Sequence, residues 1–220
     1  FKQKTAYEIR NCDWSSDVCS SDLGRLNFHC HTIHSDGSLD PADLARQACS
    51  LGLEHLAITD HHCHRALEGA RDALEEAAAE GHKVPTLWRG VEISCLLEGC
   101  LVHVLALGFG DDHASLQPYL QGSAVVGAAL RAEAVVAAIR AAGGLALLAH
   151  PARYRLPYAQ MVAAAADLGF DGAEAWYDYT MGPTWEPTPL VCDAIAADLR
   201  RRGLLLSCGT DTHGLALNGR

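Results

Sequence analysis

Short apolar runs alternate with alanine-rich helical stretches along most of this 220-residue chain. The apolar runs are almost continuously hydrophobic, which is typical of strands covered on both faces. We expect strands at 25–30, 55–60, 86–95, 100–109, 145–151, 171–177 and 204–211, and helices at 41–52, 66–81, 132–144, 158–170 and 188–203. This alternation predicts an α/β fold with a mostly parallel sheet.

Two regions depart from the alternation. Only residues 96–99 separate the third expected strand from the fourth, so this pair is predicted to form an antiparallel hairpin. Residues 111–127 have weak periodicity and are expected to form a loop over or beside the mouth of the sheet.

Nine potential metal ligands lie where the expected strands end. Six are imidazoles and three are carboxylates: His29, His31, Asp36, His61, Glu92, His103, His150, Asp211 and His213. If these groups converged without a counter-ion, the carboxylates would repel one another at a cost of several kcal/mol per buried ion. Divalent cations reverse that balance, so the pattern favours a multinuclear metallohydrolase.

The spread of these residues also bears on the type of sheet. An open doubly wound sheet would gather ligands from two or three strands at one switch point. Here nearly every expected strand ends in a candidate ligand, and all strand ends of a closed barrel face one mouth. The sequence therefore predicts a TIM-like barrel with its site at the carboxyl ends of the strands.

The positions of several candidate ligands along the expected strands support their assignment as metal ligands. His29 and His31 are two residues apart on a strand, so their side chains point the same way, and Asp211 and His213 repeat this spacing. Glu92 is an acidic residue in an apolar strand, where an unpaired charge is costly, and it suits a bridge between two metal ions.

Four further residues are candidates for support, substrate binding or catalysis. Asp60 precedes His61 and is expected to accept a hydrogen bond from that ring and fix its tautomer. Arg153, just after His150, is placed to bind a phosphate, although an ordinary surface arginine is the alternative. Tyr177 and its neighbour Trp176 end a strand, where they either stack on a base or sugar or pack in the core.

Charge and cysteine content limit the binding partners and the cellular compartment that we expect for the protein. A net charge of −10 with no extended segment rich in Lys and Arg argues against stable binding to nucleic acid or to an anionic membrane. No apolar stretch is long enough to span a bilayer. None of the nine cysteines forms a C-x-x-C pair, and their scatter predicts reduced thiols in the cytoplasm. The oligomeric state is left open.

The two ends of the chain differ from what an intact single domain would show. Residues 2–23 resemble a translated sequencing adapter with its variable index at Arg10 and Asn11, so we expect 1–23 to be a disordered, non-native leader. A short amphipathic helix is the alternative for this segment. Residues 24–220 are expected to form one domain whose last strand lacks a following helix, as if the reading frame were cut short.

The motifs FHCHTIHSDGSL, AITDHH, GVEIS, HVLALG, LLAHP and CGTDTHG resemble those of the PHP (polymerase and histidinol phosphatase) phosphoesterases over residues 26–214. The resemblance implies a distorted (β/α)7 barrel with two to three divalent ions of Mn, Zn, Fe or Mg. The implied ligand sets are His29, His31, Glu92 and Asp211 for the first metal, Glu92, His103 and His150 for the second, and Asp36, His61 and His213 for the third.

The resemblance to the short stand-alone members implies a phosphomonoesterase acting on a small metabolite, such as a nucleotide or nucleoside bisphosphate. A hydroxide bridging two metals would attack phosphorus, with Asp60, His213 and Arg153 as the expected catalytic residues. Alternatives within hydrolase chemistry are a histidinol-phosphate-type phosphatase, a 3′-5′ exonuclease and an amidohydrolase. A non-catalytic metal-binding regulatory module is the alternative of another class.

Overall fold

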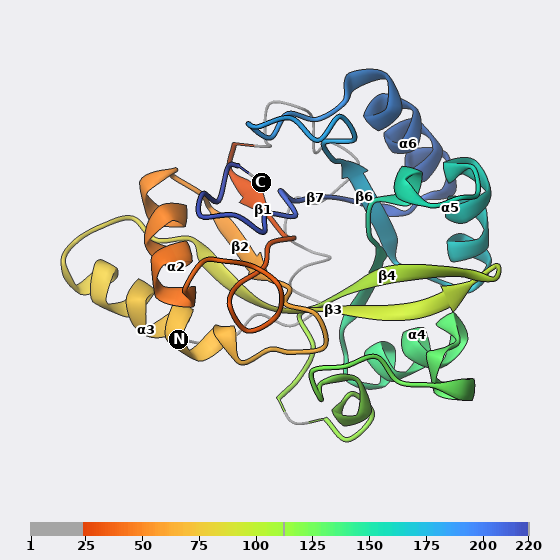
Figure 1. Ribbon diagram of the computed structural model, residues 1–220, viewed down its shortest axis with the longest axis horizontal. Coiled ribbons are helices and arrows are strands. Elements are labelled where there is room, and N and C mark those ends of the chain that lie inside the picture. Colours follow the sequence, from red (N-terminus) through yellow and green to blue (C-terminus); the bar gives the residue numbers. More distant parts are fainter. Residues whose placement is uncertain (1–23, 112, 220) are drawn as a thin grey trace.

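Seven strands form a barrel that is almost closed in the computed structural model, which describes residues 24–111 and 113–219. They follow one another in chain order: β1 Leu26–Asn27, β2 His55–Ile58, β3 Thr86–Leu97, β4 Cys100–Leu107, β5 Leu145–Leu148, β6 Gly172–Trp176 and β7 Leu205–Cys208. The segment after β7 lies beside the segment after β1, where the amide of Asp211 donates to the carbonyl of His29 at 2.8 Å (Figure 1). The predicted barrel fold is therefore confirmed.

One strand runs against the others. β3 and β4 form the predicted antiparallel hairpin, and β4 is also antiparallel to β5, whereas the other four neighbouring pairs are parallel. The hairpin turn consists of Glu98 and Gly99, whose φ angles of 51° and 68° are both left-handed. Two left-handed residues are typical of the turn that matches the twist of paired strands.

Alternation along the strands separates the barrel interior from the helix-covered exterior. Interior side chains from opposite strands pack together: Phe28, Ala57, Trp88, Leu105, Leu107, Leu145, Leu147 and Ala149. On β3, Val91 and Ile93 instead belong to the outer core, so Glu92 between them faces inward. The same alternation turns Glu174 inward between Ala173 and Ala175 of β6.

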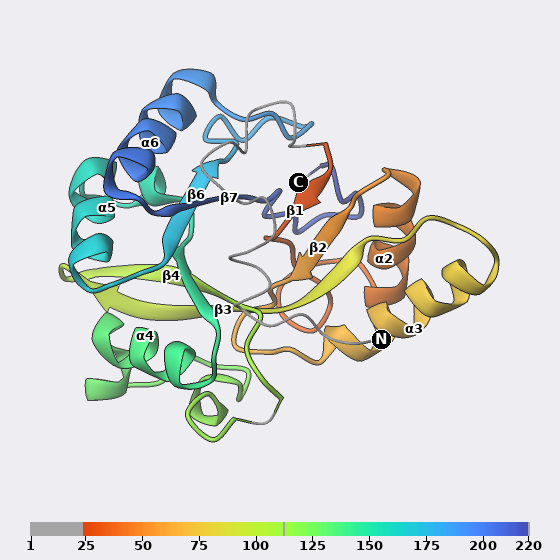
Figure 2. The same cartoon turned by 180° about the vertical axis from the view of Figure 1, so that it is seen from behind.

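Helices cover the outside of the barrel where the sequence predicts them. They are α2 Pro41–Ser50, α3 Ala66–Ala79, α4 Ala132–Ala141, α5 Tyr158–Asp167 and α6 Pro189–Arg202. α2 and α3 lie on one side of the barrel, and α5 and α6 lie on the opposite side (Figures 1 and 2). Asp40 caps α2, because its Oδ1 accepts from the amide of Ala42 at 2.9 Å.

The expected loop at 111–127 carries a 3-10 turn at Gln117–Tyr119 and leads into a second at Gly127–Leu130. Leu116 and Tyr119 are buried, and the amide of Gly122 donates to the carbonyl of His62 at 2.9 Å. The loop is thus fixed against the segment that carries His61. The leader expected at 1–23 lies outside the described residues, and among the described helices none has the length and hydropathy needed to cross a membrane.

Closure of the barrel leaves no room for a side chain at Gly209. An added Cβ would lie 2.2 Å from Cβ and 2.5 Å from the amide nitrogen of His29. We expect Gly209→Ala to lower the free energy of unfolding of the metal-free protein by about 1–3 kcal/mol, as overpacking does. In α3, Gly69 has only ordinary contact at 3.6 Å, and Gly69→Ala should raise stability by about 0.5–1 kcal/mol. Urea unfolding of both variants measures these changes; equal effects would contradict the packing at the closure.

Candidate metal centre

The nine predicted ligands converge on the mouth of the barrel, but not all of them from strand ends. Seven lie in segments that follow a strand: His29, His31, Asp36, His61, His150, Asp211 and His213. Glu92 and His103 instead lie inside β3 and β4, so the expectation that every segment ends a strand is wrong for these two. The cause is the long hairpin, which continues past the barrel rim and carries both residues in mid-strand.

The most enclosed group consists of His29, His31, Glu92 and Asp211, all of them buried. Nε2 of His29 lies 3.1 Å from Oε2 of Glu92 and 3.2 Å from Oδ1 of Asp211. Nε2 of His31 lies 3.1 Å from each of the same two oxygens. Two imidazole nitrogens and two carboxylate oxygens therefore face one point, which is the donor set predicted for the first metal.

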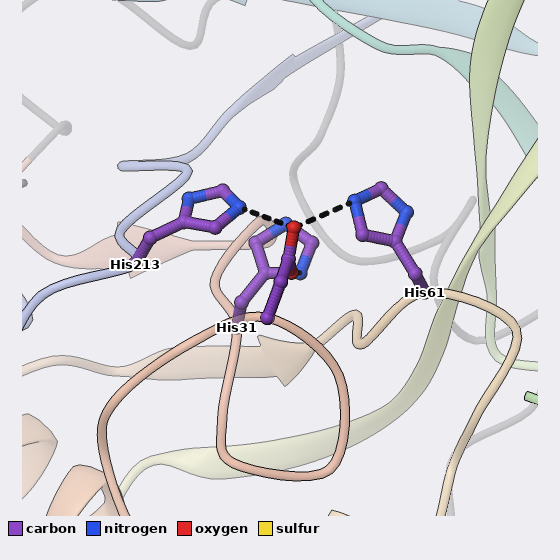
Figure 3. A group of neighbouring side chains, drawn as sticks. His31, His61 and His213 are labelled. Atoms are coloured by element: carbon purple, nitrogen blue, oxygen red, sulfur yellow. Dashed lines mark ion pairs between the residues drawn. The ribbon is translucent and has the colours of Figure 1, made fainter.

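A second group opens toward solvent. Oδ2 of Asp36 lies 3.2 Å from Nε2 of His213 and 3.7 Å from Nε2 of His61, and Oδ1 lies 3.6 Å from Nδ1 of His31. Figure 3 shows the rings of His213 and His61 facing this carboxylate from two sides. Asp36 is 55% exposed, in contrast to the buried first group. The three residues predicted for the third metal are thus brought together, with His31 as a fourth.

The remaining group joins His61, Glu92 and His103, with ligand atoms that lie within 4.8 Å of one another. Nδ1 of His103 lies 2.9 Å from Oε1 of Glu92, whereas Nε2 of His150 is 3.6 Å from the same oxygen. The structure thus places His61 closer to this group than the resemblance implies, and His150 at its edge. The backbone of His150 is left-handed at φ 27°, which sets the direction of its ring.

Glu92 connects the groups. Its Oε2 faces His29, His31 and His61, and its Oε1 faces His103 and His150. The carboxylate is 1% exposed. This two-sided arrangement is what a carboxylate bridging two cations requires.

Buried nitrogen and oxygen atoms without a hydrogen-bond partner indicate that the donor groups are suited to bind cations. Within the described residues, Nε2 of His31 and Oε1 of Glu92, which both belong to these groups, are buried and lack a hydrogen bond of good geometry. Buried polar atoms are normally satisfied. Nitrogen and oxygen ligands of this kind suit Zn, Mn and Fe alike, so the donor set does not choose among them.

The charges of the buried group are strongly coupled. Burial by itself lowers the pKa of His31, but Asp211 and Glu92 outweigh it and raise the pKa to about 9. Burial would raise the pKa of Glu92, but His29 and His103 hold it well below its usual range. Conversely, burial lowers the pKa of His61 to about 4, so this ring is neutral at pH 7 and ready to bind a metal.

Asp60 has a different role from the predicted one. Its carboxylate is fully buried and accepts from the amide and hydroxyl of Thr32 at 2.7 and 2.6 Å and from the hydroxyl of Ser35 at 2.6 Å. The ring nitrogens of His61 face Glu92 and Asp36 instead. The expected hydrogen bond from His61 to Asp60 is therefore wrong, and Asp60 anchors the loop that carries Asp36.

Arg153 and Tyr177 hold the outer oxygen of Asp211. Oδ2 of Asp211 accepts from the Tyr177 hydroxyl at 2.6 Å and from Nη1 of Arg153 at 3.0 Å. Nη1 also donates to the Tyr177 hydroxyl at 2.8 Å. Tyr177 is thus not a stacking platform but a support for a predicted ligand, and Trp176 packs in the core.

Glu174 is the residue of the centre that the motifs do not contain. It is fully buried on β6, and its Oε1 lies 3.0 Å from Nδ1 of His29. The available signal was the one that picks out Glu92, an acidic residue in an apolar strand, here in the sequence GAEAW.

Family comparison agrees with the motifs. The model of the PHP domain matches residues 27–151, more than half of the chain. The chain belongs to the PHP domain family.

Relatives and solved structures extend this result. A 5′-3′ exoribonuclease of Haemophilus influenzae is 34% identical over 97 residues, 44% of this chain and 33% of that protein. A 3′,5′-nucleoside bisphosphate phosphatase of Chromobacterium violaceum is 32% identical over 121 residues, 55% of this chain and 40% of that protein. The matched segment thus spans about a third to two fifths of the length of these relatives.

Two solved structures share the fold. A protein from Bifidobacterium adolescentis described as a metal-dependent phosphoesterase has a TM-score of 0.68 at 23% identity, covering 88% of each chain. An amidohydrolase from Chromobacterium violaceum with bound sulfate and no metal has a TM-score of 0.70 at 21% identity, covering 88% of this chain and 89% of that one. At these identities the likeness concerns the fold alone.

The opposite pKa shifts of His31 and His61 predict a stability maximum in pH for the metal-free PHP domain. A His31 pKa raised to about 9 contributes stability below pH 6.5 that is lost as the pH rises toward 9. A His61 pKa lowered to about 4 contributes stability above pH 6.5 that is lost as the pH falls toward 4. We expect the unfolding free energy of the chelator-treated protein to peak near pH 6.5, and urea titrations from pH 4 to 9 measure it. A monotonic profile over this range would contradict the coupling.

Proposed function

We propose that this PHP domain is a metal-dependent phosphoesterase that hydrolyses a phosphomonoester of a small metabolite, such as a nucleotide or nucleoside bisphosphate. The observation that supports it most is the convergence of eight donor residues into three overlapping groups within the PHP fold, with His150 at their edge. The bisphosphate phosphatase relative supports the nucleotide substrate.

We propose a trinuclear centre for this activity. His29, His31, Glu92 and Asp211 would hold one ion, and Glu92 and His103, with His61 or His150, would hold the next. His31, Asp36, His61 and His213 would hold the most exposed one. Bound divalent ions of Mn, Zn, Fe or Mg supply Lewis acidity and lower the pKa of water.

The residues of the chain supply substrate binding beside this centre. Nη1 of Arg153 is used by Asp211 and Tyr177, yet the Arg153 side chain is 41% exposed, so its other N–H groups are open to a phosphate oxygen. A phosphate held there would lie next to Asp211. Burial of the inner group excludes bulk water and strengthens its charge interactions.

A 5′-3′ exoribonuclease is the second candidate. Three of the matched relatives carry that name, with identities of 32–34%. Their direction is opposite to that of the 3′-5′ exonuclease considered from the sequence. The acidic net charge of −10 favours a short phosphorylated substrate over a long RNA strand.

We also propose that the protein works in a reducing cytoplasm. The seven cysteines of the described segments are all free thiols, and six of them, all but Cys49, are buried. Cys30 and Cys63 are buried and lie outside the three donor groups.

A substrate panel tests the proposal. Chelator-treated protein is reloaded with Mn²⁺ or Zn²⁺ and incubated with a nucleoside 3′,5′-bisphosphate, a mononucleotide, histidinol phosphate and a 5′-phosphorylated RNA oligomer. We expect metal-dependent phosphate release, fastest from the bisphosphate; sequential nucleotide release from RNA would favour the exoribonuclease. Fewer than two bound metal ions per chain with no hydrolysis of any substrate would overturn the proposed function.

Two neighbouring arginines allow a matched test of the phosphate site. Arg155 donates to the carbonyl of Gly99 on the hairpin turn, away from Asp211. We expect Arg153→Ala to lower kcat/KM by about 10- to 100-fold, the cost of roughly 1.4–2.7 kcal/mol of lost transition-state binding. Arg155→Ala should leave kcat/KM within about twofold. If both variants behaved alike in steady-state assays, Arg153 would have no special role.

A further inference from the structure

Glu174 is a buried carboxylate that contacts two of the candidate ligands, His29 and His150. It lies outside all three donor groups, yet one of its oxygens contacts His29 of the buried group and the other contacts His150 at the edge of the group around His103. Oε1 lies 3.0 Å from Nδ1 of His29, and Oε2 accepts from the backbone amide of His150 at 2.7 Å. The side chain is 0% exposed, so these contacts take the place of hydration.

The contact with His29 fixes which ring nitrogen carries hydrogen. A carboxylate can only accept, so Nδ1 of His29 must donate to Glu174. With Nδ1 committed as the donor, Nε2, which lies 3.1 Å from Glu92 and 3.2 Å from Asp211, is the nitrogen that would give up its hydrogen and offer its lone pair to a cation. Glu174 therefore directs the free lone pair to the point shared by the buried group.

The contact with His150 fixes a strained backbone. His150 has φ 27° and ψ 63°, outside the conformations that a residue with a side chain ordinarily adopts. Its amide is held by Oε2 of Glu174, and its ring is thereby turned so that Nε2 lies 3.6 Å from Oε1 of Glu92. One carboxylate thus orients a ligand candidate on each side of Glu92.

We infer that Glu174 is a positioning residue that sets the tautomer of His29 and the backbone of His150, and so prepares two metal-binding groups at once. This inference rests on the proposed function only in that the donor groups bind divalent ions. It adds to the centre a role that none of the ligand motifs contains.

Glu174→Gln separates this role from simple packing. The two side chains have nearly the same shape, and the amide oxygen can still accept from His150. The amide NH2 then faces Nδ1 of His29, which must become the acceptor, so the ring hydrogen moves to Nε2, where it points at Glu92 and Asp211. The lone pair needed for a metal is lost without a cavity being made.

Asp171→Asn is the matched control. Asp171 directly precedes β6, is 9% exposed, and accepts from the amide of Ala146 at 3.0 Å through Oδ2. The substitution makes the same chemical change just before β6, away from His29 and His150.

The test measures metal binding rather than turnover. Chelator-treated wild type, Glu174→Gln and Asp171→Asn are titrated with Zn²⁺ against a chromogenic chelator, with circular dichroism and urea unfolding to compare their folds. We expect Glu174→Gln to bind its tightest ion about 10- to 100-fold more weakly than wild type, and Asp171→Asn to bind it with wild-type affinity. Nitrogen-15 NMR of the zinc-loaded wild type should show a hydrogen-bonded Nδ1–H on His29 that Glu174→Gln lacks.

The outcomes are distinct. If wild type binds no Zn²⁺, the proposed metal centre fails, and the role of Glu174 fails with it. If wild type binds Zn²⁺ and Glu174→Gln matches it in affinity and in the Nδ1–H signal, the metal centre stands and the role of Glu174 is overturned. Equal weakening in Glu174→Gln and Asp171→Asn would likewise overturn it, because the effect would then come from general loss of stability.

Discussion

The burial of carboxylates among imidazoles at the barrel mouth is the constraint on which the rest of the structure depends. Glu92 and Asp211 are nearly inaccessible to solvent, and their charges are balanced by the rings of His29 and His31. Such a group is stable only if every member is held in place, since a buried charge that loses its partner costs several kcal/mol. Closure of the barrel holds the members of this group in place, because it brings the segment after β7 against the segment after β1.

Much of the architecture can be predicted from the sequence because it depends on local patterns. Apolar runs and alanine-rich stretches gave the strands and helices, and the short gap at 96–99 predicted the hairpin. The nine donors could be found because a charged or imidazole side chain stands out in an apolar strand. These signals come from a residue and its immediate neighbours in the chain.

The parts that were missed depend on side-chain direction. Asp60 adjoins His61 in sequence, but its carboxylate turns to Thr32 and Ser35, a choice fixed by the fold of a separate loop. The closeness of His61 to Glu92 and His103, with His150 at the edge, follows from the reversed direction of β4 and the strained backbone of His150. No spacing rule carries this information, because it depends on contacts between segments far apart in the chain.

The donor groups become more exposed to solvent across the centre, from the buried group around His29 to the exposed group around Asp36. His29 and Glu92 are enclosed, whereas Asp36 and His213 meet solvent, and His31 belongs to both groups. Because neighbouring groups share residues, the proposed trinuclear centre would exchange its ions with solvent in order, the outer one first and the innermost last. The protein would then sense a falling metal supply as a graded loss of occupancy rather than as an all-or-none event.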